Sequence, residues 1–253
     1  MFIPPRVSRN DPADAARAVR RWLKLDEQNN FDSYRAAIEA RGVLVFRSNG
    51  YAGRWQIAKE SPILGFSLYD KRCPVILVKK VRWETQQVFT MMHELGHLLM
   101  HRSGSIDDEE DMEARAGDEK EANAFAGHLL VPDEFLSSIS DADRPTDPKH
   151  SDAWLEPQRQ VWGVSVEMIL RRLLDTQRIT QTFYAAYRAH VRGLPVQDEA
   201  SGSRTWRHRE PKHIFGEPFV RTVLDALASR RITATRACSY LRSEEHTSEL
   251  QSH

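Results

Sequence analysis

The sequence predicts an α+β fold in which a small three-stranded antiparallel sheet precedes a mainly helical C-terminal region. Three short apolar runs, residues 43–46, 63–69 and 74–78, have the length and composition of strands. The later segments carry apolar residues at spacings of three and four, which is the pattern of helices. Strands followed by a run of helices are typical of α+β proteins.

Each element of this fold has a local signal. Residues 12–24 and 31–41 have apolar positions at helical spacing, and Gly42 ends the second of these helices. The first strand follows directly. Asp70 and Lys71 lie between the next two apolar runs, and turn residues in this position predict an antiparallel hairpin.

Two helices after the strands have clear apolar stripes. The first covers residues 84–101, with its stripe at Val88, Met92, Leu95 and Leu99. The second covers residues 118–131, ends at Pro132 and is expected to bury Ala122, Phe125, Ala126, Leu129 and Leu130. Further helices are expected over residues 153–190, 220–227 and 232–241.

Composition narrows the class of protein. The chain has 253 residues, of which 40% are hydrophobic and 28% charged, with a net charge of zero. These values describe a globular protein, and no apolar run approaches the roughly 20 residues of a membrane span. The N-terminus lacks the pattern of a signal peptide, and Cys73 and Cys238 have no metal-type spacing. We therefore expect a cytoplasmic protein with reduced thiols and no membrane partner.

The segment His93-Glu94-Leu95-Gly96-His97 carries the chemistry. Its two imidazoles lie four residues apart, on one helix face, where both can bind one zinc ion at about 2.0–2.1 Å. Glu94 is placed to take a proton from the attacking water. Gly96 permits close approach of another element. The alternative is an amphipathic helix with two exposed histidines, and the apolar stripe on its other face favours the zinc site.

A catalytic zinc ion needs a third protein ligand. Metzincins would require Gly at position 100 and His at position 103, where this chain has Met100 and Ser103, so that class is excluded. Gluzincins take a Glu from a second helix downstream. Glu119 and Glu121 both qualify, because each flanks the apolar stripe of residues 118–131 at a similar angle.

Two histidines are further alternatives as ligands. His101 lies one turn beyond His97, and His128 lies in the second helix. For His101, a role in supporting the ligands or ending the helix is favoured.

Residues 89–101 and 121–132 together resemble the ImmA/IrrE family of metallo-endopeptidases. The two motifs read Phe-Thr-Met-Met-His-Glu-Leu-Gly-His-Leu-Leu-Met-His and Glu-Ala-Asn-Ala-Phe-Ala-Gly-His-Leu-Leu-Val-Pro, the latter with Val131 where the family usually has Met. The resemblance covers about residues 10–135 and implies zincin-like active-site helices. It also implies that Glu121, directly before Ala-Asn, is the third zinc ligand.

The same resemblance implies an intracellular endopeptidase. Characterised members cleave a helix-turn-helix repressor and relieve repression of mobile-element or stress genes. The alternative is a regulator that binds a partner repressor or DNA without cutting it and keeps zinc as a structural clamp. Direct nucleic-acid binding, through the basic segment 204–213 or the helix-turn-helix cadence of residues 158–173, is not favoured over an exposed linker and a helical packing unit.

These observations divide the chain into four parts. We expect a zinc metallopeptidase domain over residues 10–135 and a helical domain over residues 152–192. Residues 193–241 are expected to form a linker and truncated C-terminal helices. Residues 242–253 read like a translated sequencing adapter and are expected to be a non-native tail.

Overall fold

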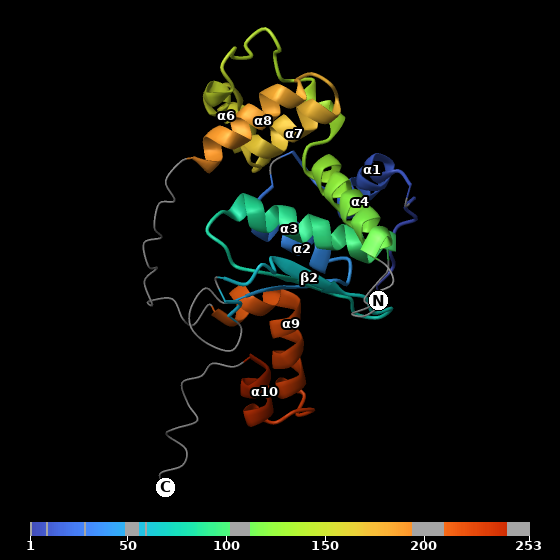
Figure 1. Ribbon diagram of the computed structural model, residues 1–253. Helices are drawn as coiled ribbons and strands as arrows, with labels where there is room; N and C mark the ends of the chain where they lie inside the picture. The colour runs from blue at the N-terminus through green and yellow to red at the C-terminus, as the bar shows by residue number, and fades with distance from the viewer. Residues whose placement is uncertain are drawn as a thin grey trace.

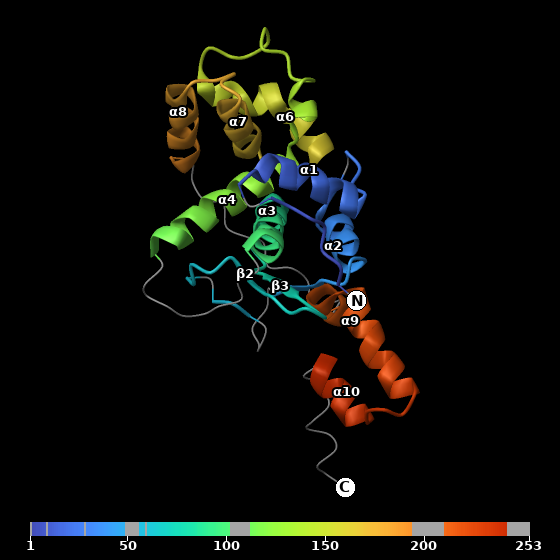
Figure 2. The same cartoon turned by 90° about the vertical axis from the view of Figure 1, so that its right-hand side faces the viewer.

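A small sheet with helices on both faces forms the centre of the molecule (Figures 1 and 2). The computed structural model describes residues 2–8, 10–27, 29–48, 56–58, 60–101, 112–193 and 210–241. Helices α2 (Phe31–Glu39) and α3 (Glu84–Gly96) cover one face of the sheet, and α9 (Glu210–Ala228) covers the other. Helices α6 (Ser151–Trp162), α7 (Val166–Asp175) and α8 (Gln181–Arg192) form a separate layer beyond α4 (Met112–Leu130). This arrangement confirms the α+β class.

The sheet is mixed rather than antiparallel. Its strands are β1 (Leu44–Arg47), β2 (Gly65–Leu68) and β3 (Val75–Val78), in the spatial order β1-β3-β2. The predicted hairpin is confirmed, since β2 pairs antiparallel with β3. The expectation of a wholly antiparallel sheet was wrong, because β1 pairs with β3 in parallel. A tight turn imposes antiparallel pairing, whereas the long connection between β1 and β2 leaves either direction open.

The hairpin turn is held by one side chain. Asp70 Oδ1 accepts hydrogen bonds from the backbone N–H groups of Arg72 (2.7 Å) and Cys73 (2.8 Å). Such an Asx-type turn supplies partners for backbone groups that no strand pairs.

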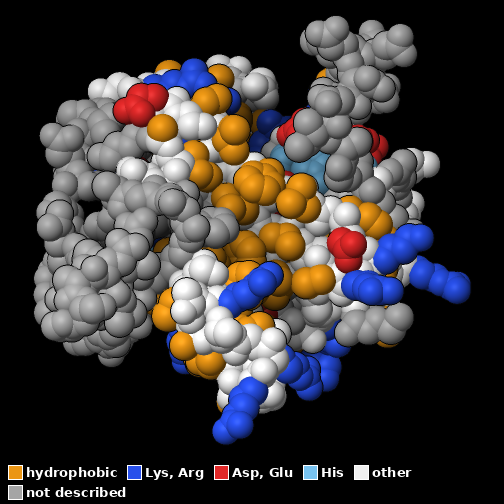
Figure 3. Space-filling view, turned by 90° about the horizontal axis from the view of Figure 1, so that it is seen from below, with side chains coloured by type: hydrophobic (Ala, Val, Ile, Leu, Met, Phe, Trp, Pro, Cys, Tyr) orange, Lys and Arg blue, Asp and Glu red, His pale blue; other side chains and the backbone are white. Residues whose placement is uncertain are grey.

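The two faces of β2 differ. A Cβ built on Gly65 would lie 2.6 Å from Thr90 Cγ2, so this strand approaches α3 very closely on one face. Phe66 and Leu68 alternate to the other face and are exposed. Figure 3 shows hydrophobic side chains gathered on the face of the molecule seen from below.

Helices α3 and α4 form the core beside the sheet. The predicted apolar stripes of both helices are buried. Close approach at Gly96 is confirmed, because a Cβ built there would lie 2.9 Å from Phe125 Cδ1 of α4. After Gly96 the helix widens into a π-helical turn, η1 (His97–His101). Such turns recur at functional sites.

The N-terminal helices begin at side-chain caps. Asp11 caps α1 (Pro12–Leu23), and Asn30 forms a capping box with Ser33 at the start of α2. Helix α1 packs along α4 (Figure 1). Its buried residues Ala15, Ala16, Val19 and Leu23 join the main core.

The helical layer after α4 begins with the short α5 (Asp133–Leu136) and η3 (Pro148–His150). It continues with α6 (Ser151–Trp162), α7 (Val166–Asp175) and α8 (Gln181–Arg192). The left-handed Gly163 (φ 65°) ends α6, and Ser165 caps α7. The residues with the helix-turn-helix cadence therefore form two helices joined by a turn. Ile169 and Leu173 of α7 are buried in the main core.

The last helices pack against the sheet. Phe215 and Phe219 of α9 contact Phe46 of β1, with ring centroids 5.7 and 5.4 Å apart. Helix α10 (Ala234–Leu241) packs on α9. Residues 242–253 and most of the segment 204–213 lie outside the described residues. In the described part of the chain, no helix combines the length and apolar character of a membrane span.

Candidate metal centre

His93 and His97 come together as predicted. Their Nε2 atoms are 3.0 Å apart, and the ring centroids are separated by 4.7 Å. Spacing of four residues on α3 and η1 accounts for this contact. Both side chains are mostly buried, with exposed fractions of 14% and 15%.

The carboxylate that joins this pair is Glu119. Its Oε2 lies 3.2 Å from His93 Nε2, and its Oε1 lies 3.2 Å from His97 Nε2. Glu119 comes from α4, which crosses α3 at Gly96. The side chain is 57% exposed, so the site opens toward solvent. Sequence spacing left Glu119 and Glu121 open, and the resemblance pointed to Glu121.

Glu121 occupies a different position. Its Oε2 lies 3.0 Å from Nε2 of His101, and Asp118 Oδ1 lies 3.5 Å from the same nitrogen. The described residues thus contain two groups of convergent donors, His93 with His97 and Glu119, and His101 with Asp118 and Glu121. Two positions along α4 turn a side chain through about 200° in an ideal helix. The two glutamates therefore point to different partners.

Contacts within hydrogen-bond distance at Nδ1, the ring nitrogen that faces away from Glu119, orient both imidazoles. His93 Nδ1 lies 3.2 Å from Asn123 Oδ1, and His97 Nδ1 lies 3.0 Å from His101 Nδ1. An acceptor on Nδ1 keeps the proton there and leaves Nε2 free to bind a metal ion. Asn123 is not among the residues that the sequence predicts at the site. Its position four residues after Glu119, on the same face of the helix, was the available signal.

Burial shifts the pKa values of the two histidines and of Glu94. It lowers the pKa of both His93 and His97, although Glu119 opposes the shift. Neutral imidazoles are the form that binds metal. Burial raises the pKa of Glu94 to about 7, against the hydrogen bond with Ser67 of β2 and together with the charge of Glu119. A carboxyl group with this pKa can both take and give a proton near neutral pH.

The donor set fits a tetrahedral metal ion. Ligand atoms that each lie about 2.0–2.1 Å from one ion are about 3.3 Å apart. The two Nε2 atoms are 3.0 Å apart, and each lies 3.2 Å from a different carboxylate oxygen of Glu119, close to that spacing. Two imidazoles and one carboxylate also leave a coordination position open. This group can therefore hold a metal ion with modest movement of the side chains.

His128 lies in neither group. Its Nδ1 is 2.8 Å from the guanidinium of Arg172 and 3.9 Å from Asp133 Oδ1. The guanidinium also donates to Val131 O at 3.0 Å. His128 thus belongs to a contact between α4 and α7 and not to the candidate metal centre.

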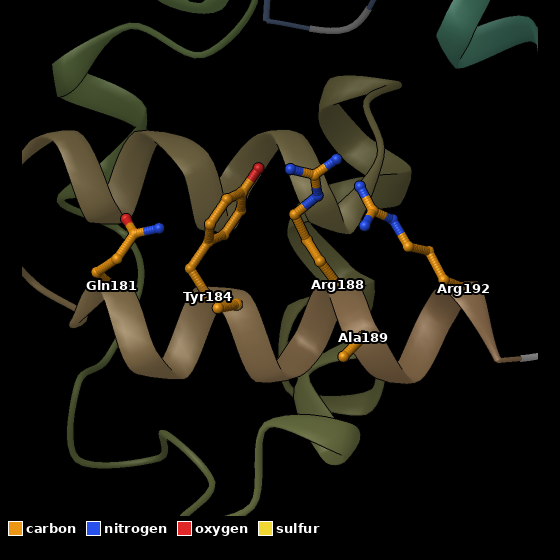
Figure 4. Close-up of a pocket in the computed structure, with 6 residues that line it drawn as sticks. Gln181, Tyr184, Arg188, Ala189 and Arg192 are labelled. Atoms are coloured by element: carbon orange, nitrogen blue, oxygen red, sulfur yellow. The ribbon is translucent and has the colours of Figure 1, made fainter.

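A hollow on α8 carries no comparable chemistry. Figure 4 shows Tyr184 and Arg188 lining it from one helix. Both side chains already contact Glu167, at 3.3 Å and 3.0 Å. None of its lining residues belongs to either donor group.

Parts of this chain are similar to known proteins. Residues 39–174 match the Peptidase_M78 family, described as the IrrE N-terminal-like domain. Over 91 residues the chain is 32% identical to "Uncharacterized immunity region protein 2" of Bacillus phage phi105, a match covering 35% of this chain and 56% of the phage protein. A solved structure, "Mycobacterium tuberculosis transcriptional regulator", aligns with a TM-score of 0.44 and 20% identity over 68% of this chain and 48% of that one. The chain belongs to the metallopeptidase-like IrrE N-terminal-like family.

Proposed function

We propose that the protein is a zinc-dependent endopeptidase that cuts a helix-turn-helix transcriptional repressor in the cytoplasm. The observation that carries the proposal is the convergence of His93 Nε2, His97 Nε2 and Glu119 within 3.0–3.2 Å. Glu94, the acid–base residue of this motif, lies in the same turn of α3 as His93. In this proposal Glu119 is the third ligand, and Glu121 has another role.

The chain's own residues supply proton transfer. A zinc ion held by these residues would provide Lewis acidity toward the scissile carbonyl and toward water. Glu94 takes the proton of the attacking water and delivers it to the nitrogen of the leaving amine. Burial raises the pKa of Glu94, and the charge of a bound zinc ion would lower it toward the range in which the carboxylate accepts a proton from water.

Strand β2 is the proposed binding site for the peptide. Ser67 of β2 hydrogen-bonds to Glu94. Within the described residues, β2 has a strand neighbour on one side only, β3. An extended peptide that adds to the other side would run past Glu94, because strand addition aligns a peptide with the edge it joins.

Similarity to known proteins supports a transcriptional repressor as the substrate. The family resemblance implies repressor cleavage, and the phage relative is named as an immunity region protein. A repressor that controls a mobile element is the substrate that fits both. Because the match spans 56% of the phage protein, the repressor substrate stands as a proposal for this chain.

The test is coexpression with any helix-turn-helix repressor that is found to be encoded next to this gene. Wild type and Glu94→Gln are compared after both have been shown to hold equal zinc. We expect cleavage by the wild type only, with Glu94→Gln slowed by a factor of at least 10². If the zinc-loaded wild type leaves the repressor intact under inducing conditions, the peptidase proposal fails. If Glu94→Gln relieves repression as well as the wild type does, zinc serves as a structural clamp in a regulator.

A further inference from the structure

We propose that His101 and Glu121 form a hydrogen-bonded support that orients His97 for the metal ion. In this arrangement Glu121 acts through His101 and does not bind the ion. The inference rests on the proposed metal site of His93, His97 and Glu119. It assigns separate tasks to the two glutamates that the sequence could not distinguish.

The support is a continuous chain of short contacts. His97 Nδ1 lies 3.0 Å from His101 Nδ1, and His101 Nε2 lies 3.0 Å from Glu121 Oε2. The His101 side chain has 0% exposed area, whereas that of Glu121 is 34% exposed. The chain therefore runs from the metal ligand through a fully buried ring to a carboxylate in contact with solvent.

Metal binding would set the direction of every hydrogen bond in this chain. An ion on His97 Nε2 requires the proton of that ring to lie on Nδ1. His97 Nδ1 then donates to His101 Nδ1, which must be the unprotonated nitrogen. The remaining proton of His101 lies on Nε2 and is donated to Glu121. Both nitrogens of the buried ring are thereby satisfied.

The two metal-binding histidines are supported differently. Behind His93 stands the neutral amide of Asn123, 3.2 Å from Nδ1. Behind His97 stands a ring that is itself bonded to a carboxylate. A carboxylate at the end of such a chain makes the ligand more basic and fixes its ring orientation. We therefore expect His97 to depend on the charge of Glu121.

A second cation bound by His101, Asp118 and Glu121 is the competing interpretation. It would require His101 Nε2 to be unprotonated and would raise the zinc content to two ions. Asp118 lies 3.5 Å from that nitrogen, beyond good hydrogen-bond length, while Glu121 lies at 3.0 Å. An ion on His101 Nε2 would place the proton of that ring on Nδ1, 3.0 Å from the protonated Nδ1 of a metal-bound His97. Two N–H groups would then face each other, so the hydrogen bond to Glu121 is favoured over a second ion.

The experiment measures zinc affinity and stoichiometry on the full chain, by competition with a chromophoric chelator. Wild type is compared with Glu121→Gln, His101→Phe and the double variant. Glu119→Gln is the control for loss of a direct ligand, and Asn123→Ala is the matched control on the His93 side. Circular dichroism checks that each variant is folded.

We expect one zinc ion per wild-type chain. Glu121→Gln and His101→Phe should each weaken zinc binding by about 10- to 100-fold. Glu119→Gln should weaken it more than either. In the His101→Phe background, Glu121→Gln should have no further effect, because a residue that acts through His101 loses its influence when the ring is gone.

A nuclear magnetic resonance measurement tests the proton positions directly. In the zinc-loaded protein with ¹⁵N-labelled histidine, His101 should carry its proton on Nε2, and the assignment follows from the signal lost in His101→Phe.

The outcomes separate this inference from the proposed function. No zinc binding by the wild type would overturn both. Normal zinc binding that neither Glu121→Gln nor His101→Phe weakens would overturn only the support. A loss from Glu121→Gln that persists in the His101→Phe background would make Glu121 a ligand, and two zinc ions per chain would establish the second cation site. Protonation of His101 on Nδ1 would also overturn the proposed chain.

Discussion

Gly216 of α9 lies directly over the buried carboxylate of Glu39 in α2. A Cβ built on Gly216 would come within 2.0 Å of Glu39 Oε1 and 3.0 Å of an Arg35 guanidinium nitrogen. The backbone of Gly216 is also left-handed, with φ 77°. Glu39 cannot move aside freely, because Arg35 Nε bonds to it at 3.1 Å and both side chains are buried. Only glycine fits at this position.

Gly216→Ala should therefore destabilise the protein by about 2–4 kcal/mol, the sum of backbone strain and overpacking. Urea unfolding of the purified chain measures the change. Gly193→Ala is the matched control, since its Cβ would meet only ordinary contacts at 3.4 Å or more. Equal stability of the two variants would show that α9 does not rest on Glu39 in solution.

Arg172 and Arg171 give a second matched pair on α7. The Arg172 side chain is 1% exposed and bonds to Val131 O, His128 and Asp133, whereas that of Arg171 is 58% exposed and pairs only with Asp175 in the contacts described. Arg172→Met should cost about 2–4 kcal/mol, because it leaves the buried Val131 carbonyl without its partner. Arg171→Met should cost less than about 1 kcal/mol. Thermal unfolding distinguishes the two, and similar losses would contradict the buried role of Arg172.

Gly65 connects the sheet to the candidate metal centre. Its added Cβ would meet Thr90 Cγ2 at 2.6 Å and the Leu77 carbonyl oxygen at 2.9 Å. Gly65→Ala should push β2 away from α3, disturb the bond between Ser67 and Glu94, and destabilise the fold by about 1–3 kcal/mol. Under the proposed function, cleavage of the repressor should fall as well. Gly117→Ala, where nothing lies within 4 Å of the new Cβ, should retain both stability and cleavage.

His213, near the start of α9, should make stability depend on pH. Desolvation and the charges of Arg47, Lys80 and Arg35 lower its pKa to about 4, with Asp32 opposing them. Lys80 Nζ lies 3.2 Å from Nε2, so the neutral ring accepts this hydrogen bond. Part of the ring is exposed to solvent, which will weaken the effect of these charges.

The sign follows from the unfolded chain, where His has a pKa of about 6.5. Between pH 6.5 and 4 the unfolded state binds the proton more readily. The stability from neutral His213 is complete above pH 6.5 and is lost as the pH falls toward 4. Urea unfolding from pH 7 to pH 5 should show a smaller loss for His213→Gln than for wild type. Identical profiles would contradict the prediction.

Local patterns were sufficient to predict the helices and strands, and to place His93 and His97 of the candidate site side by side. The stripe of Val88, Met92, Leu95 and Leu99 predicted the buried face of α3 and η1, and the hairpin around Asp70 was correct. These features depend on residues close in sequence. The parallel pairing of β1 with β3 depends on a crossover, which no local pattern encodes.

The choice between Glu119 and Glu121 has the same origin. Both flank the apolar stripe of α4, so amphipathicity ranks them equally. The crossing of α3 and α4 at Gly96 and the widened turn at His97–His101 decide which carboxylate meets which imidazole. A crossing angle and a π-helical turn are properties of packed helices and cannot be read from residue spacing. Whether Glu119 binds the ion stays a prediction for the zinc measurements.

Arg35 sets a limit on how the protein can be cut into pieces for study. Its guanidinium donates to the carbonyl oxygens of Lys212, His213 and Ile214, at 3.3, 2.8 and 3.0 Å. A recombinant fragment of residues 10–135 would lack these three acceptors and would uncover Phe46, the aromatic side chain of β1 that meets α9. Such a fragment would aggregate more readily than the full chain. The smallest fragment suitable for crystallisation or enzymology therefore contains both α2 and α9.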